Sequence, residues 1–436
     1  MEFLERQFKI REHGSSVKTE IFAGLTTFMT MGYIIFVNPD ILSQAGMPFG
    51  PLMVATCLSS AIACFLMAVL ANYPIGLAPG MGLNAFFTFS VVIGMQIDWQ
   101  VALGAVFVEG CIFIALTLTR LRETVVNTIP KSLKIGIASG IGLFIAFIGL
   151  QGAGIVVADA ATLVKLGSLR NNLPALLAVG GLVLMAVLEY LKVPGGLLVG
   201  IVAVTAASIG LGLQAPPTEI VSMPPSLAPI FLKMKFSQIG QLSFWVIVFT
   251  FFFVDFFDTV GTLVGVCNRS GMLDEDGTLP NARGALMADA VGTVAGAMLG
   301  TSTVTSYVES ASGVAQGGRT GLTAIVVGIL FLLAVFFSPI VGMVPSYATA
   351  PALIVVGIYM MAGLRDLDYD DWTELVPAML AFFMMPLAYS IAVGIEFGIV
   401  SYVLIKVLAG RAKDVSGVTF FLAAVFIVYE LCFKLA

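Results

Sequence analysis

FFFVDFFDTVGTL, residues 251–263, places Asp255 and Asp258 in an apolar run, and GTSTVTSYVESASGV, residues 300–314, follows with Glu309 in its middle. Between these stretches, the small-residue segment 286–300 carries Asp289. A carboxylate within a lipid-spanning segment is costly and in general marks a functional site. These four acids therefore predict a site inside a membrane, and the remaining segments are expected to hold it there.

The composition of the chain indicates its class. The 436 residues are 59% hydrophobic and 11% charged, whereas soluble domains carry roughly 25% charged residues. Apolar runs of about 20 residues, the length that crosses a bilayer, recur throughout. We therefore expect an all-α polytopic membrane protein. The formal net charge of −5 is distributed over short loops and gives no reason to expect nucleic acid as a partner.

Several classes of site are excluded by residue usage. The single histidine, His13, precedes the first apolar run, which excludes HExxH metalloprotease and histidine-cluster metal sites. No nucleophile motif is present, so an embedded enzyme is not expected. The five cysteines lie within apolar segments or just beyond one, and they form no secreted disulfide pattern. The sequence predicts no metal and no cofactor, and the charged N-terminal segment does not resemble a cleavable signal peptide.

Hydropathy predicts membrane spans in two sets. The first set lies near 21–40, 50–72, 76–92, 100–119, 132–151, 173–190 and 194–213, and the second near 242–263, 283–300, 303–316, 321–342, 346–363, 374–391, 395–409 and 417–434. With the N-terminus inside, most of the 21 Lys and Arg residues fall on inside loops; Lys165, Arg170, Lys233, Lys235 and Lys434 do not. The positive-inside rule therefore predicts a cytoplasmic N-terminus.

The two halves repeat one another weakly. The segment from Ile129 resembles the segment from Val344, with Gly142 matching Gly357, and LPALL from Leu173 resembles VPAML from Val376. Seven spans separate the copies, so the second copy is inverted, and the short interrupted segments 76–92 and 303–316 correspond. Inverted repeats with broken helices are typical of alternating-access transporters. Segment 417–434 is either an unmatched extra helix or the true last span, with 374–409 as one broken unit.

The first broken segment is YPIGLAPGMGLNAFFTF, residues 73–89. Pro79 and its neighbouring glycines free backbone groups that are tolerated in a membrane only when they are buried in protein or line a cavity. Asn84 then offers a two-way amide, and Phe86, Phe87 and Phe89 offer rings for stacking. The alternative is a glycine-packed helix with a proline kink.

The second broken segment carries hydroxyls from Ser302, Thr303, Thr305 and Ser306, with Glu309 one to two turns later. A helix cap explains the hydroxyls without a ligand. It does not explain Glu309, whose burial needs a partner, so Glu309 is interpreted as a ligand or proton carrier.

The other acids in the apolar segments are harder to interpret. Asp255 and Asp258 are spaced i, i+3 and share one helix face, and two carboxyl groups so close in a poorly solvated site favour a shared proton. The alternative is a solvated pair at the cytoplasmic end of the span. Asp289 has a structural or a ligating role, and for Glu109 in the fourth span the sequence suggests no clear role.

At these positions the chain resembles the azaguanine-type purine permeases, a branch of the nucleobase–cation symporters. The resemblance covers nearly the whole chain and rests on FKIREHGSSVKTEIFAGLTTFMTMGYIIFVNP from Phe8, APGMGLNAFFTF from Ala78, FVDFFDTVGTL from Phe253, GTSTVTSYVESASGVAQGGRTGLTA from Gly300 and VPSYATAPAL from Val344. It implies about fourteen spans in two inverted sevens, as in the uracil permease, with a short strand and a half-helix in the third and tenth spans.

The resemblance also implies roles for particular residues. Asp258, Glu309, Asn84, Thr303 and Thr305 are expected to bind substrate. Proton coupling or structural support is expected from Glu309, Asp258, Asp289 and Asp255, although the role of Asp255 stays open. A core made of residues 1–119 and 240–345 is expected to move against a gate made of 120–239 and 346–436, where 214–240 connects the halves.

The implied function is proton-coupled import of purine bases across the plasma membrane, with hypoxanthine and guanine favoured because both broken motifs resemble those members. Adenine is the competing substrate. An anion transporter or channel of the same fold is a further alternative, but Asp258 and Glu309 disfavour it. A homodimer is possible in this family.

Overall fold

The computed structural model describes residues 2–119, 130–170, 172–270, 272 and 279–429. These residues form two compact units, the first containing Met1–Thr117 and Gly149–Ala352 and the second containing Leu118–Ile148 and Leu353–Ala436. The units describe which segments contact each other; the proposed division into a moving core and a gate stays a prediction.

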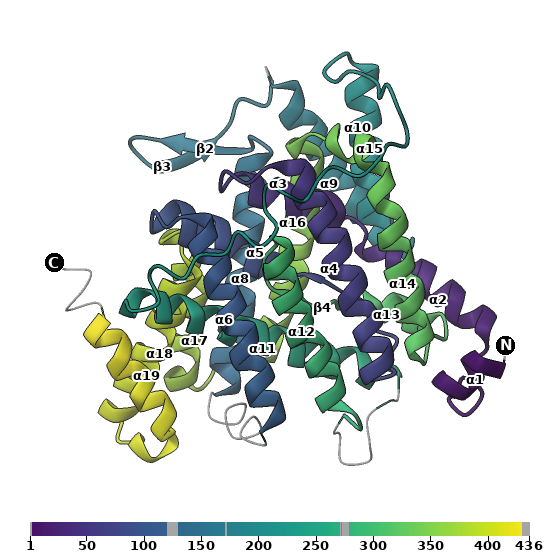
Figure 1. The fold of residues 1–436 in the computed structure, drawn as a ribbon. Coiled ribbons are helices and arrows are strands. Elements are labelled where there is room, and N and C mark those ends of the chain that lie inside the picture. The colour runs from purple at the N-terminus through teal and green to yellow at the C-terminus, as the bar shows by residue number, and fades with distance from the viewer. Residues whose placement is uncertain (1, 120–129, 171, 271, 273–278, 430–436) are drawn as a thin grey trace. The chain divides into compact units, whose positions relative to one another are not determined.

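The chain is mostly helical (Figure 1). The first unit contains α1 (Glu2–Phe8), α2 (Val17–Met31), α3 (Ile34–Ser43), α4 (Phe49–Leu70), β1 (Leu77–Pro79), α5 (Met81–Ala85), the π-helix η1 (Phe86–Gly94), α6 (Trp99–Leu118), the hairpin strands β2 (Val156–Asp159) and β3 (Leu163–Leu166), α9 (Leu173–Tyr190) and α10 (Gly196–Gly210). It continues with α11 (Leu242–Ser270), α12 (Ala282–Leu299), β4 (Val304–Ser306), α13 (Ser310–Ala315), α14 (Gly321–Ala334), η2 (Val335–Phe337) and α15 (Ser338–Gly342).

The second unit contains η3 (Met361–Asp366), α17 (Trp372–Leu387), α18 (Ile391–Leu408), η4 (Ala412–Asp414) and α19 (Gly417–Tyr429). Two helices, α8 (Lys131–Gly152) and α16 (Ser346–Met360), contribute to both units. In the described part of the chain, 9 helices are long and apolar enough to cross a membrane, and four shorter apolar helices accompany them. The last part of the predicted final span, 430–434, lies outside the described residues.

The two broken spans meet in the first unit. Strands β1 and β4 pair antiparallel, with Ala78 opposite Thr305. The Gly80 N–H donates to the Thr303 carbonyl at 3.0 Å, and the Tyr307 N–H donates to the Gly76 carbonyl at 3.0 Å. Pro79 and the glycines prevent a continuous helix, and each segment resumes as a helix after its strand. The predicted arrangement of a short strand followed by a half-helix is therefore confirmed at both breaks.

Neighbouring helices satisfy the rest of the broken backbone. The Thr293 hydroxyl on α12 donates to the Val304 carbonyl at 2.9 Å and accepts from the Val304 N–H at 3.2 Å. The Tyr307 hydroxyl donates to the Pro79 carbonyl at 2.6 Å. Helix α4 lies beside both α12 and α14 (Figure 1), and it also contacts β1. Irregular backbone at this depth is tolerated because protein groups replace the missing water.

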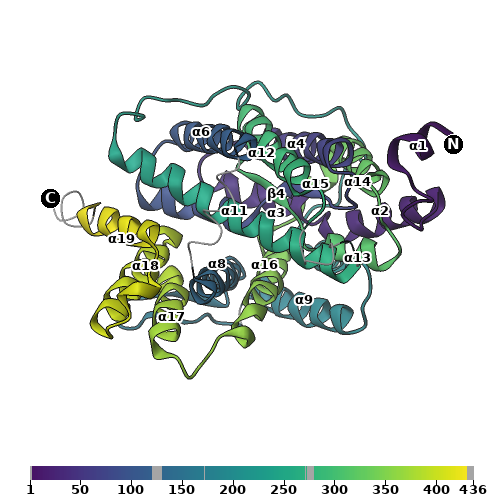
Figure 2. The same cartoon turned by 90° about the horizontal axis from the view of Figure 1, so that it is seen from below.

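Two glycines that the sequence comparison matched lie against each other in the second unit. A Cβ added at Gly142 on α8 would lie 2.6 Å from the Gly357 carbonyl oxygen on α16, so these two matched glycines bring their helices into close contact. Helices α17 and α18 pack on each other, as α9 and α10 do in the first unit, and α19 packs on α18 (Figure 2). Whether α19 is the last span of the repeat or an addition to it stays a prediction.

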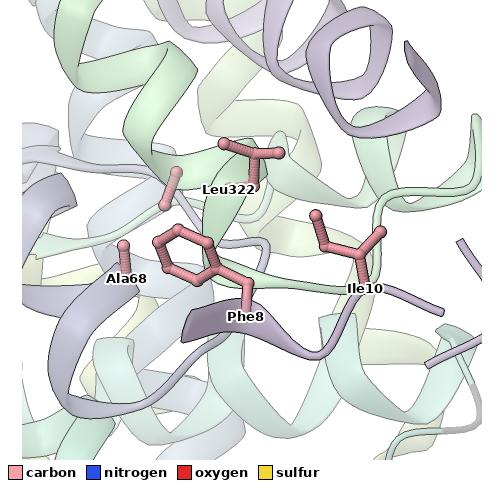
Figure 3. Packing of buried hydrophobic residues seen from close by; sticks show 5 residues of the cluster. Phe8, Ile10, Ala68 and Leu322 are labelled. Atoms are coloured by element: carbon pink, nitrogen blue, oxygen red, sulfur yellow. The ribbon is translucent and has the colours of Figure 1, made fainter. Parts of the chain in front are cut away.

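The N-terminal segment is held by burial. Phe8 and Ile10 pack with Ala68 of α4 and Leu322 of α14 (Figure 3). Glu20 of α2, fully buried, accepts hydrogen bonds from the Arg319 N–H at 2.9 Å and the Thr320 N–H at 3.2 Å. These bonds fix the segment just before α14, whose own N-cap is Thr320, with its hydroxyl accepting from the Leu322 N–H.

Candidate functional site

Asp258 and Glu309 are the two acids of the predicted site that are partly exposed. Asp258 lies on α11, and Glu309 stands immediately before α13, the half-helix of the tenth span. Helices α11 and α13 are in contact, and the two carboxyl groups are close enough to interact electrostatically. The fold thus brings together two hydrogen-bond acceptors that lie 51 positions apart in the sequence.

Tyr33 completes the surroundings of Glu309. The helical structure of the first span is interrupted at Gly32 and Tyr33, between α2 and α3. The Tyr33 hydroxyl donates to Glu309 Oε1 at 2.5 Å. The Thr30 hydroxyl lies 2.9 Å from the Ser312 hydroxyl on α13. The sequence did not point to Tyr33, because placing a tyrosine in a membrane span costs little free energy and so does not mark it as functional. The sequence around it, MGY at 31–33 in the middle of the first span, marks the break.

Thr305 and Asp258 are linked, whereas Thr303 and Asn84 lie deeper. The Thr305 hydroxyl donates to Asp258 Oδ2 at 3.4 Å. Asn84 and Thr303 are both fully buried. The Ser302 hydroxyl donates to Asn84 Oδ1, which ties the two broken spans together. Within the described residues, the Thr303 hydroxyl and the Asn84 Nδ2 have no hydrogen-bond partner.

The three aromatic residues of the third span are engaged with protein. Phe86 and Phe87 are fully buried, and the Phe86 ring meets the Phe251 ring edge to face with centroids 4.8 Å apart. Phe89 is 4% exposed. The Phe86 and Phe87 rings therefore pack the third span against α11, and the expectation that these two rings stack on a ligand finds no support in this arrangement.

Asp289 and Asp255, in contrast to the partly exposed Asp258 and Glu309, are fully buried. Asp289 Oδ1 accepts a hydrogen bond from the Thr259 hydroxyl at 2.8 Å, and Thr259 lies 2.8 Å from the Thr305 hydroxyl. Asp289 therefore connects α12 to α11 and, through two hydroxyls, to the broken strand β4. Asp255 faces Glu109 of α6, a residue for which the sequence alone suggested no role.

The arrangement suits a small polar ligand that carries N–H groups. Two partly exposed carboxyl groups accept hydrogen bonds, one from helix α11 and one from the start of the half-helix α13. Among the described residues, no group of three His, Cys, Asp or Glu side chains is arranged to hold a metal ion. The two carboxyl groups can accept hydrogen bonds from a ligand and can exchange protons.

Three sequence relatives of the chain, like the family that it matches, are named permeases. Residues 18–397 match the Permease family (Xan_ur_permease). The chain is 52% identical to the putative permease MJ0326 of Methanocaldococcus jannaschii over 98% of both chains. It is 47% identical to the guanine/hypoxanthine permease PbuG of Bacillus subtilis, over 98% of this chain and 99% of the relative. It is 45% identical to the adenine permease AdeP of Escherichia coli, over 97% and 95%.

The fold is shared with more distant transporters. The transmembrane domain of the cyanobacterial bicarbonate transporter BicA aligns with a TM-score of 0.67 at 16% identity, covering 87% of this chain and 97% of that domain. At this identity the likeness concerns the fold alone.

Proposed function

Since the chain belongs to the Permease family, and is a nucleobase permease of the membrane rather than an enzyme, we propose that it imports purine bases, hypoxanthine and guanine above all, together with protons. The observation that carries the proposal is the pair Asp258 and Glu309, partly exposed beside the broken tenth span. Asn84 and Asp289 hold the broken spans, and Thr303 and Thr305 belong to the pocket wall.

Hypoxanthine and guanine fit a carboxylate acceptor. Each presents an N1–H donor next to the O6 acceptor, so a carboxylate at Glu309 or Asp258 accepts from N1–H while a backbone N–H donates to O6. Adenine presents an acceptor at N1 and a donor at N6, which reverses this pattern unless the acid is protonated. The identities to PbuG and AdeP, 47% and 45%, are close enough that competition between the bases has to decide.

An anion transporter is the rival from a different class, because the fold is shared with BicA. Asp258 and Glu309 disfavour it, since an anion next to two carboxyl groups is repelled unless both are protonated. In the proposed mechanism the core, 1–119 and 240–345, moves against the gate, 120–239 and 346–436, in a plasma membrane with the N-terminus inside. A homodimer is compatible with this mechanism.

The substrate is tested by uptake of labelled hypoxanthine in a host that lacks purine transport. We expect guanine to compete strongly, adenine weakly and uracil least. Strong competition by adenine with none by guanine would reassign the substrate, and uptake of bicarbonate or sulfate instead of any base would favour the anion carrier.

Replacing Tyr33 by Phe tests whether the hydroxyl orients Glu309. We expect hypoxanthine affinity to fall by about tenfold, because a hydrogen bond to a charged group contributes about 1.5–3 kcal/mol and only part of it acts on the ligand. The measurement is equilibrium binding to the purified protein. Tyr369→Phe is the matched control, since Tyr369 is 56% exposed. Equal affinity in Tyr33→Phe and wild type would show that Glu309 needs no such support.

A further inference from the structure

The structure contains a second pair of acids that the base site does not use. Glu109 of α6 and Asp255 of α11 are both 0% exposed, and their carboxyl groups lie within hydrogen-bonding reach of one another. Helix α6 contacts both neighbours here. The Phe113 ring lies 5.7 Å from the Phe252 ring of α11, and a Cβ at Gly110 would lie 3.1 Å from Thr293 of α12.

Neither acid has a donor. Within the described residues, no N–H or O–H group donates to any of the four carboxyl oxygens of Glu109 and Asp255, and no cation pairs with them. The ionisable groups that face the pair are Asp289 from α12 and Asp258 from α11 itself, both acids, with Cys111 adjacent on α6. Two facing carboxyl groups without a donor hydrogen bond to each other only if at least one carries a proton.

Asp289 interacts electrostatically with both acids of the pair, and a chain of hydroxyls connects Asp289 to the base site. Thr259 donates to Asp289 Oδ1 at 2.8 Å and lies 2.8 Å from the Thr305 hydroxyl, which reaches Asp258 Oδ2 at 3.4 Å. Thr305 has one hydroxyl hydrogen and two acceptors within reach, Thr259 and Asp258. The Thr305 hydrogen can therefore point to either acceptor, which makes this hydroxyl a switchable link between Asp258 and Thr259.

We propose that Glu109 and Asp255 share one proton and form a proton site separate from the base pocket, joined to Asp258 through Asp289, Thr259 and Thr305. The proposal deepens the proposed function, on which it rests, by assigning the coupling proton a place. The step is a proton transfer alone. An O–H bond of the pair breaks as one forms at Asp289. The Thr259 hydrogen turns from Asp289 Oδ1 towards Thr305; Asp289 then gives its proton to Thr259, Thr259 gives its own to Thr305, and Thr305 gives its own to Asp258, so that Asp289 and both hydroxyls end with as many protons as they began with.

The test uses the double variant Glu109→Gln/Asp255→Asn in the full-length protein. An amide pair retains a hydrogen bond between the two side chains without a titratable proton, so the packing of α6 on α11 is preserved. In proteoliposomes with an acidic exterior, we expect accumulation of hypoxanthine to fall about 100-fold, the scale on which a positioned proton carrier acts. Exchange of labelled for unlabelled hypoxanthine, which needs no net proton movement, is expected to persist.

Thr259→Val interrupts the relay and is expected to reduce accumulation in the same way. Thr250→Val is its matched control, because Thr250 is a buried threonine of the same helix whose hydroxyl donates to the Val246 carbonyl. Accumulation lost in Thr259→Val and kept in Thr250→Val supports the relay. Equal loss in both variants contradicts it.

Infrared spectroscopy gives a readout independent of transport. The purified wild type is expected to show the C=O stretch of a neutral carboxylic acid at neutral pH, and the double variant is expected to lose it. Full accumulation by the double variant, or an unchanged carboxylic-acid band in it, overturns the shared-proton site. A wild type that neither accumulates nor exchanges hypoxanthine overturns the proposed function instead, so the two failures are distinguishable.

Discussion

Replacing Glu309 by Gln is expected to reduce hypoxanthine affinity and uptake by about 10- to 100-fold, because a hydrogen bond to a charged partner contributes about 1.5–3 kcal/mol. The amide is the same size and still accepts from Tyr33, whose hydroxyl lies 2.5 Å from Glu309 Oε1. It removes the negative charge and turns one acceptor oxygen into an N–H₂ donor, which then faces the N1–H of the base. Uptake and equilibrium binding, normalised to the amount of protein in the membrane, measure both effects.

The matched control is Glu219→Gln, which makes the same chemical change at an exposed loop position. Wild-type uptake by Glu309→Gln would return Glu309 to a structural role beside Tyr33. Loss of the protein from the membrane in Glu309→Gln alone would have the same meaning, since it would show that the acid supports the fold.

Replacing Asp258 by Asn is expected to have an effect of similar size, about 10- to 100-fold on hypoxanthine affinity, for the same reason. The change removes the negative charge and replaces one of the two acceptor oxygens by an N–H₂ donor, at a position where the Thr305 hydroxyl lies 3.4 Å from Asp258 Oδ2. Asp98→Asn, at an exposed position before α6, is the control.

The two changes are also informative together. Residues that hold one ligand have coupled effects, whereas distant independent sites have additive free energies. We expect the double variant Glu309→Gln/Asp258→Asn to lose less affinity than the product of the two single losses. Strict additivity would mean that the two acids do not contact the same base.

Much of the candidate site could be predicted from the sequence because carboxyl groups and unpaired backbone groups cost free energy in lipid. Asp258, Asp289 and Glu309 draw attention as acids in apolar runs, and Pro79 with its neighbouring glycines indicates a broken helix. The strand and half-helix at each break were implied by the family resemblance, whereas the pairing of β1 with β4 is seen only in the structure. The acids and the breaks depend on local sequence, and the structure places all of them in the first unit.

The parts that escaped sequence reasoning depend on partners far away in the chain. Tyr33 contacts Glu309 across 276 positions, and a tyrosine in a span carries no penalty that would single it out. The role of Glu109 depends on Asp255, which faces it from another helix and is 146 positions away in the sequence. Phe86 and Phe87 illustrate the opposite error, because rings near a predicted site suggested stacking on a ligand whereas they pack against Phe251.

Accumulation of hypoxanthine in proteoliposomes tests the central claim most directly. The purified protein is reconstituted, a pH gradient with an acidic exterior is imposed, and the internal concentration of labelled hypoxanthine is followed with and without a protonophore. The account predicts that hypoxanthine rises above its external concentration and falls back to it when the gradient is dissipated. Entry that only equilibrates, or that is indifferent to the protonophore, would contradict proton-coupled import.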